Sequence, residues 1–317
     1  MDAKPTRDGF GQELVALGKE NKGIVVVSAD LEDATRAEYF KKEFPERFFS
    51  LGIAEQDMIG TAAGLSLHEE LIPVANSFAV FLTNRAYDMI RIDICYNNRN
   101  VKLACSHAGV TVGEDGATAQ CLEDFALMSV LPNMKVLCPV DFIEAKKATR
   151  AMMNIKGPVY IRLSRAALPI ITKENDPFVI GKAVMMREGK DVTLIGCGLM
   201  VSESLQAADM LRKEGIEARV INMHTLKPLD EDMIIRCAKE TGAIVTAEEH
   251  HIHGGLGSSV ASAIAQLKPV PVEMVAMKDA FGESGDPQGL LKKYHLKDVD
   301  IAGAAKKAMK RKGNIII

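Results

Sequence analysis

With 317 residues, the chain is long for one hydrophobic core and comfortable for two. Its composition, 47% hydrophobic and 26% charged, is that of an ordinary globular protein. The net charge is −3, tryptophan is absent and aromatic residues make up only 5%, which argues against nucleic acid and anionic membranes as partners. No apolar run approaches the ~20 residues that span a bilayer, so no membrane association is expected.

The cysteines and the N-terminus bear on where the protein functions. The six cysteines are scattered, and none forms a CxxC pair or a metal-finger spacing: Cys95, Cys105, Cys121, Cys138, Cys197 and Cys237. This pattern predicts small buried thiols in a reducing compartment. The first ten residues, MDAKPTRDGF, are too polar for a secretory signal. We therefore expect a cytoplasmic protein.

Short apolar runs alternate with amphipathic segments through the first half of the chain. Strands are predicted at 24–27, 47–51, 71–75, 101–105, 134–140 and 159–163, and helices at 35–44, 51–65, 79–95, 121–131 and 141–153. Apolar strands that alternate with helices are typical of a parallel sheet covered on both faces. In such a sheet, ligands bind at the loops that follow the carboxyl ends of the strands.

The alternation breaks at 168–178, where LPIITKENDPF contains two prolines and a polar cluster. It resumes with strands at 191–196, 218–223, 243–247 and 272–277 and helices at 201–213, 230–239 and 256–267. We predict an α/β protein with a first domain at 1–170, a linker at 171–180 and a smaller α/β domain at 181–317. The tail GNIII at 313–317 is expected to be an edge strand or an ordered terminus.

The segment 51–65, LGIAEQDMIGTAAGL, places Glu55 at the mouth of an apolar helix. The spacing of a buried helix is kept by Ile53, Met58, Ile59, Ala62, Ala63 and Leu65. Gly60 and Gly64 would allow another backbone to approach closely. A carboxylate at such a place is costly unless it has a partner. The simpler interpretation is an acidic first-turn residue that favours the helix dipole, and spacing alone leaves both interpretations open.

Polar side chains gather at or just after the predicted strand ends: Asp30, Glu55, His107, Asp115 and Arg165. His107 and Asp115 lie in a loop with three glycines, which is unusual for a purely structural connection. In a functional interpretation, a near-neutral His107 donates to a polar substrate and Asp115 accepts from a substrate hydroxyl. Arg165 offers a planar fork to a phosphate or carboxylate. A loop histidine, a turn-capping aspartate and surface arginines are the structural alternatives, and Arg7 carries the same ambiguity.

Two further motifs have simpler structural interpretations. Gly196-Cys197-Gly198 lies between a strand and a helix, but it lacks the third glycine and the acidic residue of a dinucleotide fingerprint, so we expect a tight turn. The segment 248–257, EEHHIHGGLG, groups three histidines, yet HHxH lacks the i, i+4 spacing of a helical metal site. We therefore expect no metal site in this chain.

Seven segments together resemble the C-terminal half of a transketolase, which is a pyrimidine-binding domain followed by a transketolase C-terminal domain. They are TRDGFGQEL (6–14), SADL (28–31), GIAEQDM (52–58), SFAVFLTNRAYDMIR (77–91), SHAGVTVGEDG (106–116), IRLSR (161–165) and AEEHHIHGGLG (247–257). The likeness covers nearly the whole chain. GIAEQ alone also occurs in relatives that use the same cofactor.

The resemblance implies thiamine diphosphate as the cofactor. Glu55 matches the glutamate that hydrogen-bonds N1′ of the aminopyrimidine and thereby selects its imino tautomer, which makes Glu55 a catalytic residue. Phe81 matches the aromatic residue that stacks on the pyrimidine, and Phe78 lies near it in the same motif. Periodicity alone explains both phenylalanines equally well as core residues. Asp30 lies in the family's SAD segment and is assigned to the cofactor side.

On the sugar side, the resemblance implies that His107 and Asp115 contact substrate hydroxyls, with His107 also catalytic, and that Arg7 and Arg165 hold the sugar phosphate. Two positions depart from the family. Ala119, followed by Gln120, stands where a histidine or glutamine is usual, and Ala34, followed by Thr35, stands where a serine is often found. The contacts that the family's polar side chains would make at these two positions are therefore lost, shifted to the neighbouring residue or supplied in another way.

The diphosphate side of the cofactor site is missing. Mg²⁺ prefers oxygen ligands and is held in this family by a GDG…N motif, but GDG does not occur in the sequence. The resemblance therefore implies a separate partner chain that carries the GDG…N motif, the diphosphate and Mg²⁺, with a two-fold heterotetramer as the expected assembly. The expected reaction moves a two-carbon ketol group from a ketose phosphate to an aldose phosphate, and only with the partner present.

Two other functions stay open. One is the β subunit of a 2-oxo acid dehydrogenase E1 component, which has a similar length, the same domain order and a GIAEQ-like stretch. The other is a non-catalytic regulatory subunit that keeps only the fold. SHAGVTVGEDG together with LSR favours the transketolase over the first of these, and the full set of site residues favours it over the second.

Overall fold

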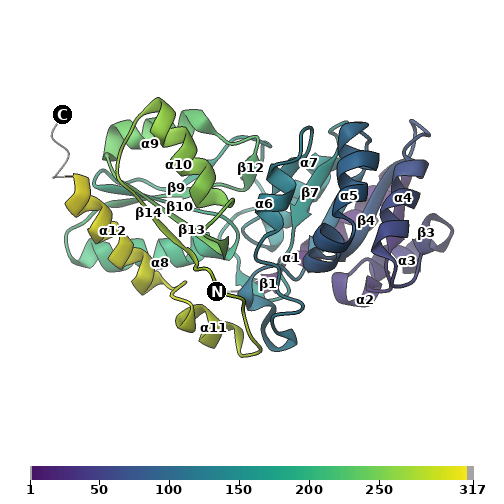
Figure 1. The fold of residues 1–317 in the computed structure, drawn as a ribbon, viewed down its shortest axis with the longest axis horizontal. Helices are drawn as coiled ribbons and strands as arrows, with labels where there is room; N and C mark the ends of the chain where they lie inside the picture. The colour runs from purple at the N-terminus through teal and green to yellow at the C-terminus, as the bar shows by residue number, and fades with distance from the viewer. Residues whose placement is uncertain (1, 313–317) are drawn as a thin grey trace.

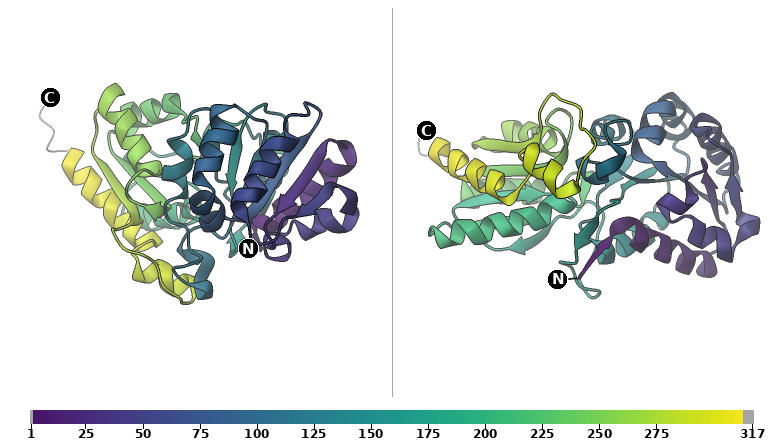
Figure 2. Two further views of the ribbon diagram at one scale, coloured as in Figure 1. Left: turned by 45° about the vertical axis from the view of Figure 1, so that its right-hand side comes forward. Right: turned by 90° about the horizontal axis from the view of Figure 1, so that it is seen from below.

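The computed structural model describes residues 2–312, so the predicted tail at 313–317 lies outside the described residues. Two α/β domains lie side by side, and the predicted fold class is confirmed (Figure 1). The N-terminal strand β1 (Ala3–Pro5) lies near the junction between the domains, whereas α12 (Asp298–Lys312) runs to the far end of the second one (Figure 2). Within residues 2–312, no helix is long and apolar enough to cross a membrane.

The first domain contains a seven-stranded sheet in the order β12-β6-β7-β5-β4-β2-β3. Its parallel strands are β2 (Ile24–Ser28), β3 (Phe48–Ser50), β4 (Ile72–Phe78), β5 (Lys102–Ser106), β6 (Lys135–Leu137) and β7 (Val159–Arg162). One face is covered by α1 (Thr6–Glu20), α3 (Glu38–Glu43) and α7 (Phe142–Met153), and the other by α4 (Glu55–Leu65), α5 (Tyr87–Met89) and α6 (Asp124–Ser129). Val26 and Val27 of β2 enter opposite cores, as the alternation of a strand requires.

The second domain contains a five-stranded sheet in the order β14-β13-β10-β11-β9. Its strands are β9 (Val184–Arg187), which is antiparallel to β11, and the parallel β10 (Val192–Gly196), β11 (Ala218–Asn222), β13 (Ile244–His251) and β14 (Val272–Met277). The helices α8 (Leu199–Lys213) and α12 pack on one face, and α9 (Glu231–Thr241) and α10 (Leu256–Leu267) on the other. The short α11 (Pro287–Lys293) contacts the 110–115 segment of the first domain.

Two predicted helices are broken in the structure. The predicted helix at 35–44 is divided into α2 (Glu32–Thr35) and α3 by Arg36, whose φ of 69° lies in the left-handed region that ends helices. The predicted helix at 79–95 consists of π-helical turns, η2 (Phe81–Arg85) and η3 (Ile90–Tyr96), on either side of α5. Such turns are rare and often accompany functional sites.

The prediction for one side of α4 was wrong. Ile53 is 75% exposed rather than buried. Gly60 and Gly64 are exposed, and a Cβ at either would meet no atom of residues 2–312 within 4 Å, so no backbone of the described chain approaches them. Ile53 and exposed Leu67 flank the two ends of α4, and exposed Asp57, Gly60 and Gly64 lie between them; we call this side the α4 face.

A strand that the sequence did not predict joins the two domains. The first sheet is completed by β12 (Thr225–Lys227), which comes from the second half of the chain and pairs antiparallel with β6 through Thr225 and Leu137. β12 thereby covers the edge of the sheet that β6 would otherwise expose. A second small sheet pairs β1 with β8 (Ala167–Pro169) beside the same junction.

A buried carboxyl group lies between the two domains. Glu144 of α7 is 4% exposed; its Oε2 accepts the Val140 N–H at 2.7 Å and its Oε1 accepts from Asn222 of β11 at 2.8 Å. Burial raises the pKa of Glu144 from 4.5 to about 8, with nearby Asp141 adding to the rise. The folded protein therefore holds a proton here at neutral pH.

We expect Glu144→Gln to raise the melting temperature at pH 8 and above while changing it little at pH 5. The unfolded chain loses the Glu144 proton near pH 4.5, whereas the folded chain keeps it up to about 8, so wild-type stability falls as the pH rises through this window. At about 1.4 kcal/mol for each pKa unit, the gain for the amide amounts to a few kcal/mol. Melting curves from pH 5 to 9 measure it, and a gap between the two proteins that stays constant with pH contradicts the assignment.

Candidate active site

Glu55 begins α4, directly after the turn that leaves β3. Gly52 in this turn has a φ of 72°, a conformation that favours glycine, and it brings the chain sharply from the strand into the helix. The Glu55 side chain is only 4% exposed, so it is buried rather than being a solvated first-turn acid. Arg85 Nη1 donates to Glu55 Oε1 at 3.0 Å, which supplies the partner that a buried carboxylate needs.

Three flat rings follow one another beside this carboxylate. The rings of Phe78, at the end of β4, and Phe81, in η2, lie nearly parallel with centroids 5.5 Å apart. Phe78 also stacks on His107 at 3.7 Å, which follows β5, the neighbouring strand. The Arg85 guanidinium lies over the Phe81 ring, with Cζ 4.2 Å from its centroid. A planar cation is thus held between an aromatic face and the Glu55 carboxylate.

His107 is a neutral side chain in a cationic surrounding. Burial, and then the charges of Arg7, Arg165 and Arg36, lower its pKa from 6.5 to about 3. Arg7 Nη1 lies 3.3 Å from Nε2, and because arginine only donates, Nε2 accepts. The ring proton is therefore assigned to Nδ1, which donates to Ser106 Oγ at 2.7 Å. We expected His107 to be a donor toward substrate; in this arrangement its free nitrogen is an acceptor.

Arg165 and Asp115 meet at the mouth of the same region. Arg165 Nη1 donates to the Val112 carbonyl at 2.6 Å and to Glu114 Oε2 at 2.7 Å, and its Nη2 lies 3.9 Å from Asp115 Oδ1. The side chains of Arg165 and Asp115 are each about one-third exposed, which leaves both accessible. The loop that carries Asp115 is kinked at Gly113, whose φ of 81° and ψ of −117° favour glycine.

Asp30 and Gln120 behave differently from the other site residues. Asp30 follows β2 with a φ of 58° and is exposed, and within residues 2–312 it forms no hydrogen bond or ion pair.

Gln120 is buried, and its amide N–H groups donate to the carbonyls of Val110 at 3.1 Å and Glu283 at 2.9 Å. Its side chain therefore ties the loop to the second domain, and nothing in the structure supports a shift of the contact missing at Ala119 to Gln120.

Two arginines of the site were missed in the sequence. Arg85 lies within the family-like segment 77–91, and only folding shows that it meets Glu55, 30 residues away. Arg36 donates through Nε to Asp8 Oδ1 at 2.8 Å, beside Arg7. Arg36 follows two residues after Ala34, where the family's serine is missing. This departure in the sequence could have indicated Arg36 as a candidate site residue.

Two glutamates of the histidine-rich segment make structural contacts. Glu248 accepts the backbone N–H groups of Leu256 and Gly257 at the start of α10, and Glu249 accepts the Thr111 N–H at 3.0 Å. Glu249 thereby links the second domain to the loop that contains Asp115. Among residues 2–312, no group of three or more His, Cys, Asp or Glu is placed to hold a metal ion.

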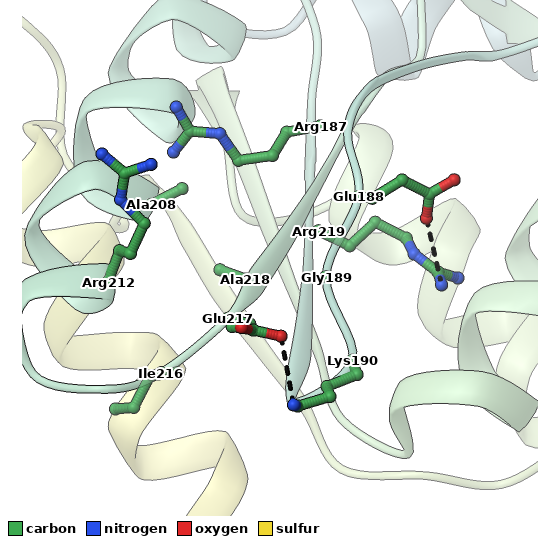
Figure 3. Close-up of a pocket in the computed structure, with 10 residues that line it drawn as sticks. All are labelled: Arg187, Glu188, Gly189, Lys190, Ala208, Arg212, Ile216, Glu217, Ala218 and Arg219. Carbon is green, nitrogen blue, oxygen red and sulfur yellow. Dashed lines mark ion pairs between the residues drawn. The ribbon is translucent and has the colours of Figure 1, made fainter.

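A separate hollow of about 530 Å³ lies in the second domain, between α8 and the strands β9 and β11 (Figure 3). Arg187 and Arg212 lie on one side of it, and Lys190 pairs with Glu217 at 3.2 Å. It contains none of the site residues described above, and it is not continuous with the strand ends where they gather.

The comparisons with known proteins agree with this architecture. A transketolase pyrimidine binding domain matches residues 2–170, and a transketolase C-terminal domain matches residues 181–301. A putative transketolase C-terminal section of Methanocaldococcus jannaschii is 42% identical over 311 residues, 97% of each chain. The 6-deoxy-6-sulfo-D-fructose transketolase subunit SqwH of Clostridium sp. is 40% identical over 306 residues, 96% of this chain and 95% of that one.

Among solved structures, a split gene transketolase described as an inactive beta4 tetramer is 45% identical, with a TM-score of 0.90. The match covers 98% of this chain and 100% of that chain. The fold and site define a two-domain α/β protein whose polar side chains meet at the carboxyl ends of a parallel sheet. The chain belongs to the transketolase family.

Proposed function

We propose that this chain is the C-terminal subunit of a two-chain transketolase that uses thiamine diphosphate. It transfers a two-carbon ketol group from a ketose phosphate to an aldose phosphate. The observation that carries the proposal is the arrangement of Glu55 and Phe81, where a buried carboxylate and an aromatic face contact the same planar group, the half-exposed guanidinium of Arg85. Beside it, through the stacked ring of Phe78, lies an arginine cluster around a neutral histidine, His107.

The Arg85 guanidinium supplies a test of whether the pocket fits the aminopyrimidine ring. It is flat, it stacks on Phe81, and it donates to Glu55, which are the contacts that a pyrimidine protonated at N1′ would make. The pocket residues therefore fit the ring, and the ring and Arg85 compete for one place. When bound, the cofactor supplies a stabilised carbanion equivalent for breaking and making carbon–carbon bonds. Glu55 would hold the proton at N1′, and the Phe81 ring would orient the pyrimidine.

The rest of the cofactor site belongs to a second chain in this proposal. The sequence has no GDG motif, and a hard Mg²⁺ ion with a diphosphate needs several oxygen ligands. The similarity to a C-terminal section and to a split gene transketolase supports a partner that supplies them. The six free cysteines of the described chain fit our expectation of a reducing compartment such as the cytoplasm.

The α4 face is the proposed docking surface for that partner. It begins beside Glu55 and presents exposed Ile53 and Leu67 with two open glycines between them. Ile92 and Tyr96 of η3, which packs beside α4, are also exposed, Tyr96 by 81%. Apolar side chains exposed around a half-complete site favour a protein partner over solvent. We propose that two copies of this chain and two partner chains form a two-fold heterotetramer.

In this proposal, Arg7 and Arg165 bind the anionic group of the sugar substrate. His107 accepts a hydrogen bond from a substrate hydroxyl through Nε2 once Arg7 turns to the anion, and Asp115 accepts from another hydroxyl. Asp30, exposed beside the cofactor side of the site, remains assigned to cofactor binding. An uncharged sugar would offer no anion for the guanidiniums of Arg7 and Arg165 to bind, so a substrate with a negatively charged end group is favoured.

We expect Arg165→Ala to raise KM for phosphorylated sugars by about 10- to 100-fold, the size of a lost charge-assisted hydrogen bond. KM for an uncharged ketose such as erythrulose should change by less than about threefold, because that donor has no anion for Arg165 to bind. Steady-state kinetics of the complex with both donors measure the difference. Equal effects on the two donors would contradict a phosphate contact at Arg165.

A further inference from the structure

Arg36 is held rigidly beside the proposed anion site. It lies between α2 and α3 with a φ of 69°, a conformation that costs a non-glycine residue about 1 kcal/mol or more and that recurs at functional sites. Its Nε donates to Asp8 Oδ1 at 2.8 Å and its Nη1 to the Asp33 carbonyl at 2.9 Å. Within residues 2–312, its Nη2 has no partner, and one-quarter of the side chain is exposed.

Arg36, Arg7 and His107 belong to one cationic cluster. Arg7, next to Asp8, donates through Nη1 to the Ala34 carbonyl at 2.6 Å, and its buried Nε has no partner among the described residues. Burial and the charge of Arg36 lower the pKa of Arg7, and the charge of Arg36 also contributes to the low pKa of His107. The contacts agree, because Arg36 binds Asp8, the residue after Arg7, and Arg7 Nη1 lies 3.3 Å from His107 Nε2. The cluster has guanidinium nitrogens without a partner among residues 2–312.

The chemistry of residues 34 to 36 differs from that of the family. The family often has a serine at position 34, where this chain has Ala34, and a guanidinium follows at Arg36. Because Arg7 donates to the Ala34 carbonyl and Arg36 donates to Asp8, the residue after Arg7, this segment places a charged donor near Arg7. The benefit of an added positive charge grows with the negative charge on the ligand, and a phosphate monoester carries about −1.5 to −2 near pH 7, against −1 for a sulfonate.

We propose that Arg36 is a third guanidinium for the anionic end of the sugar and makes the site selective for phosphate esters over sulfonates. Asp8 is a positioning residue that fixes the guanidinium so that Nη2 remains available. This inference rests on the proposed function and specifies its substrate class.

The competing explanation is mechanical. Arg36 also links α2 to α1 through Asp8, so its loss could simply loosen the region around Arg7. A loosened region would impair every donor, charged or uncharged, whereas loss of an anion contact would impair phosphate most. The comparison of donors therefore separates the two explanations.

The test uses the complex of this chain with its N-terminal partner, thiamine diphosphate and Mg²⁺, and three donors: fructose 6-phosphate, 6-deoxy-6-sulfofructose and erythrulose. For Arg36→Ala, we expect kcat/KM to fall about 10- to 100-fold with the phosphate donor, only a few-fold with the sulfonate, and not at all with erythrulose. Arg36→Lys should restore part of the loss, because a point charge remains. Arg212→Ala, which removes an arginine from the distant hollow of Figure 3, should change none of the three values.

Calorimetric titration of the same complexes with inorganic phosphate gives a readout that needs no turnover. We expect Arg36→Ala to weaken phosphate binding about tenfold or more while melting within a few degrees of the wild type. An equal loss with all three donors, or unchanged phosphate binding, would overturn the inference even if ketol transfer is observed. Wild-type complex that binds phosphate through Arg36 but transfers no ketol group would instead overturn the proposed function alone.

Discussion

Glu55→Ala should lower kcat for ketol transfer by at least about 100-fold in the two-chain complex, because proton control by a positioned side chain contributes about 10²- to 10⁴-fold. The residue is buried, and it is the carboxylate placed against the planar group that stacks on Phe81. Single-turnover and steady-state rates measure the loss. Circular dichroism and the melting temperature should show an intact fold, since the apolar contacts of α4 are unchanged.

A matched variant separates catalysis from a simple helix effect. Asp232→Ala removes an exposed first-turn acid from α9, so it has the same kind of dipole cost as Glu55→Ala, at most about 1 kcal/mol, without touching the site. We expect Asp232→Ala to keep normal turnover. Near-normal kcat in Glu55→Ala would remove Glu55 from the mechanism and would favour a subunit that retains only the fold.

Arg85→Ala tests whether the Arg85 guanidinium and the cofactor compete for the same place beside Glu55 and Phe81. If the guanidinium occupies the place of the pyrimidine, its removal should tighten binding of thiamine diphosphate by several-fold, because the cofactor no longer displaces an ion pair from Glu55 and Phe81. Fluorescence titration of the complex with cofactor and Mg²⁺ measures the affinity. Weaker cofactor binding would instead show that Arg85 stays in place and orients Glu55.

The second large effect is dependence on a partner chain: the isolated chain should transfer no ketol group, and the partner should create the activity. In the proposed function, residues of this chain would contact the pyrimidine and the sugar, whereas the sequence has no GDG motif for the diphosphate and Mg²⁺. We expect activity to rise with added N-terminal chain and to saturate at a 1:1 ratio, with light scattering showing two copies of each. The partner should be encoded by a reading frame with a GDG…N motif and should co-purify.

The isolated chain should still associate with itself, because self-association would shield the exposed Ile53 and Leu67 side chains from solvent. Ketol transfer by the isolated chain would contradict the two-chain proposal. Decarboxylation of 2-oxo acids by the complex, without ketol transfer, would favour the E1 β subunit instead.

Two matched glycines test where the proposed partner docks. Gly60 of α4 and Gly303 of α12 are both exposed and lie within helices, and a Cβ added at either position would meet no atom of residues 2–312 within 4 Å. Both positions therefore have open space beside the backbone for a larger side chain to enter. We expect Gly60→Trp to block reconstitution with the partner and Gly303→Trp to leave it normal. Normal reconstitution of both variants would move the docking surface away from α4.

The sequence by itself determined the fold class and the order of most strands and helices. The buried strand β2 is a run of four apolar residues and a serine, and β5 continues after Lys102 with apolar and small residues, a pattern that depends only on neighbours along the chain. The rule that ligands bind after the carboxyl ends of parallel strands then drew attention to Glu55, His107 and Arg165 before any geometry was known.

Only the tertiary structure decided which side chains meet. Arg85 pairs with Glu55 across 30 residues, and Arg36 pairs with Asp8 across 28. Arg85 ends the π-helical segment η2, and Arg36 itself has a left-handed backbone conformation. β12 completes a sheet whose other strands lie more than 60 residues earlier in the chain. Periodicity reports the face on which a residue lies, whereas ion pairs and sheet edges depend on the approach of distant segments, which no local pattern encodes.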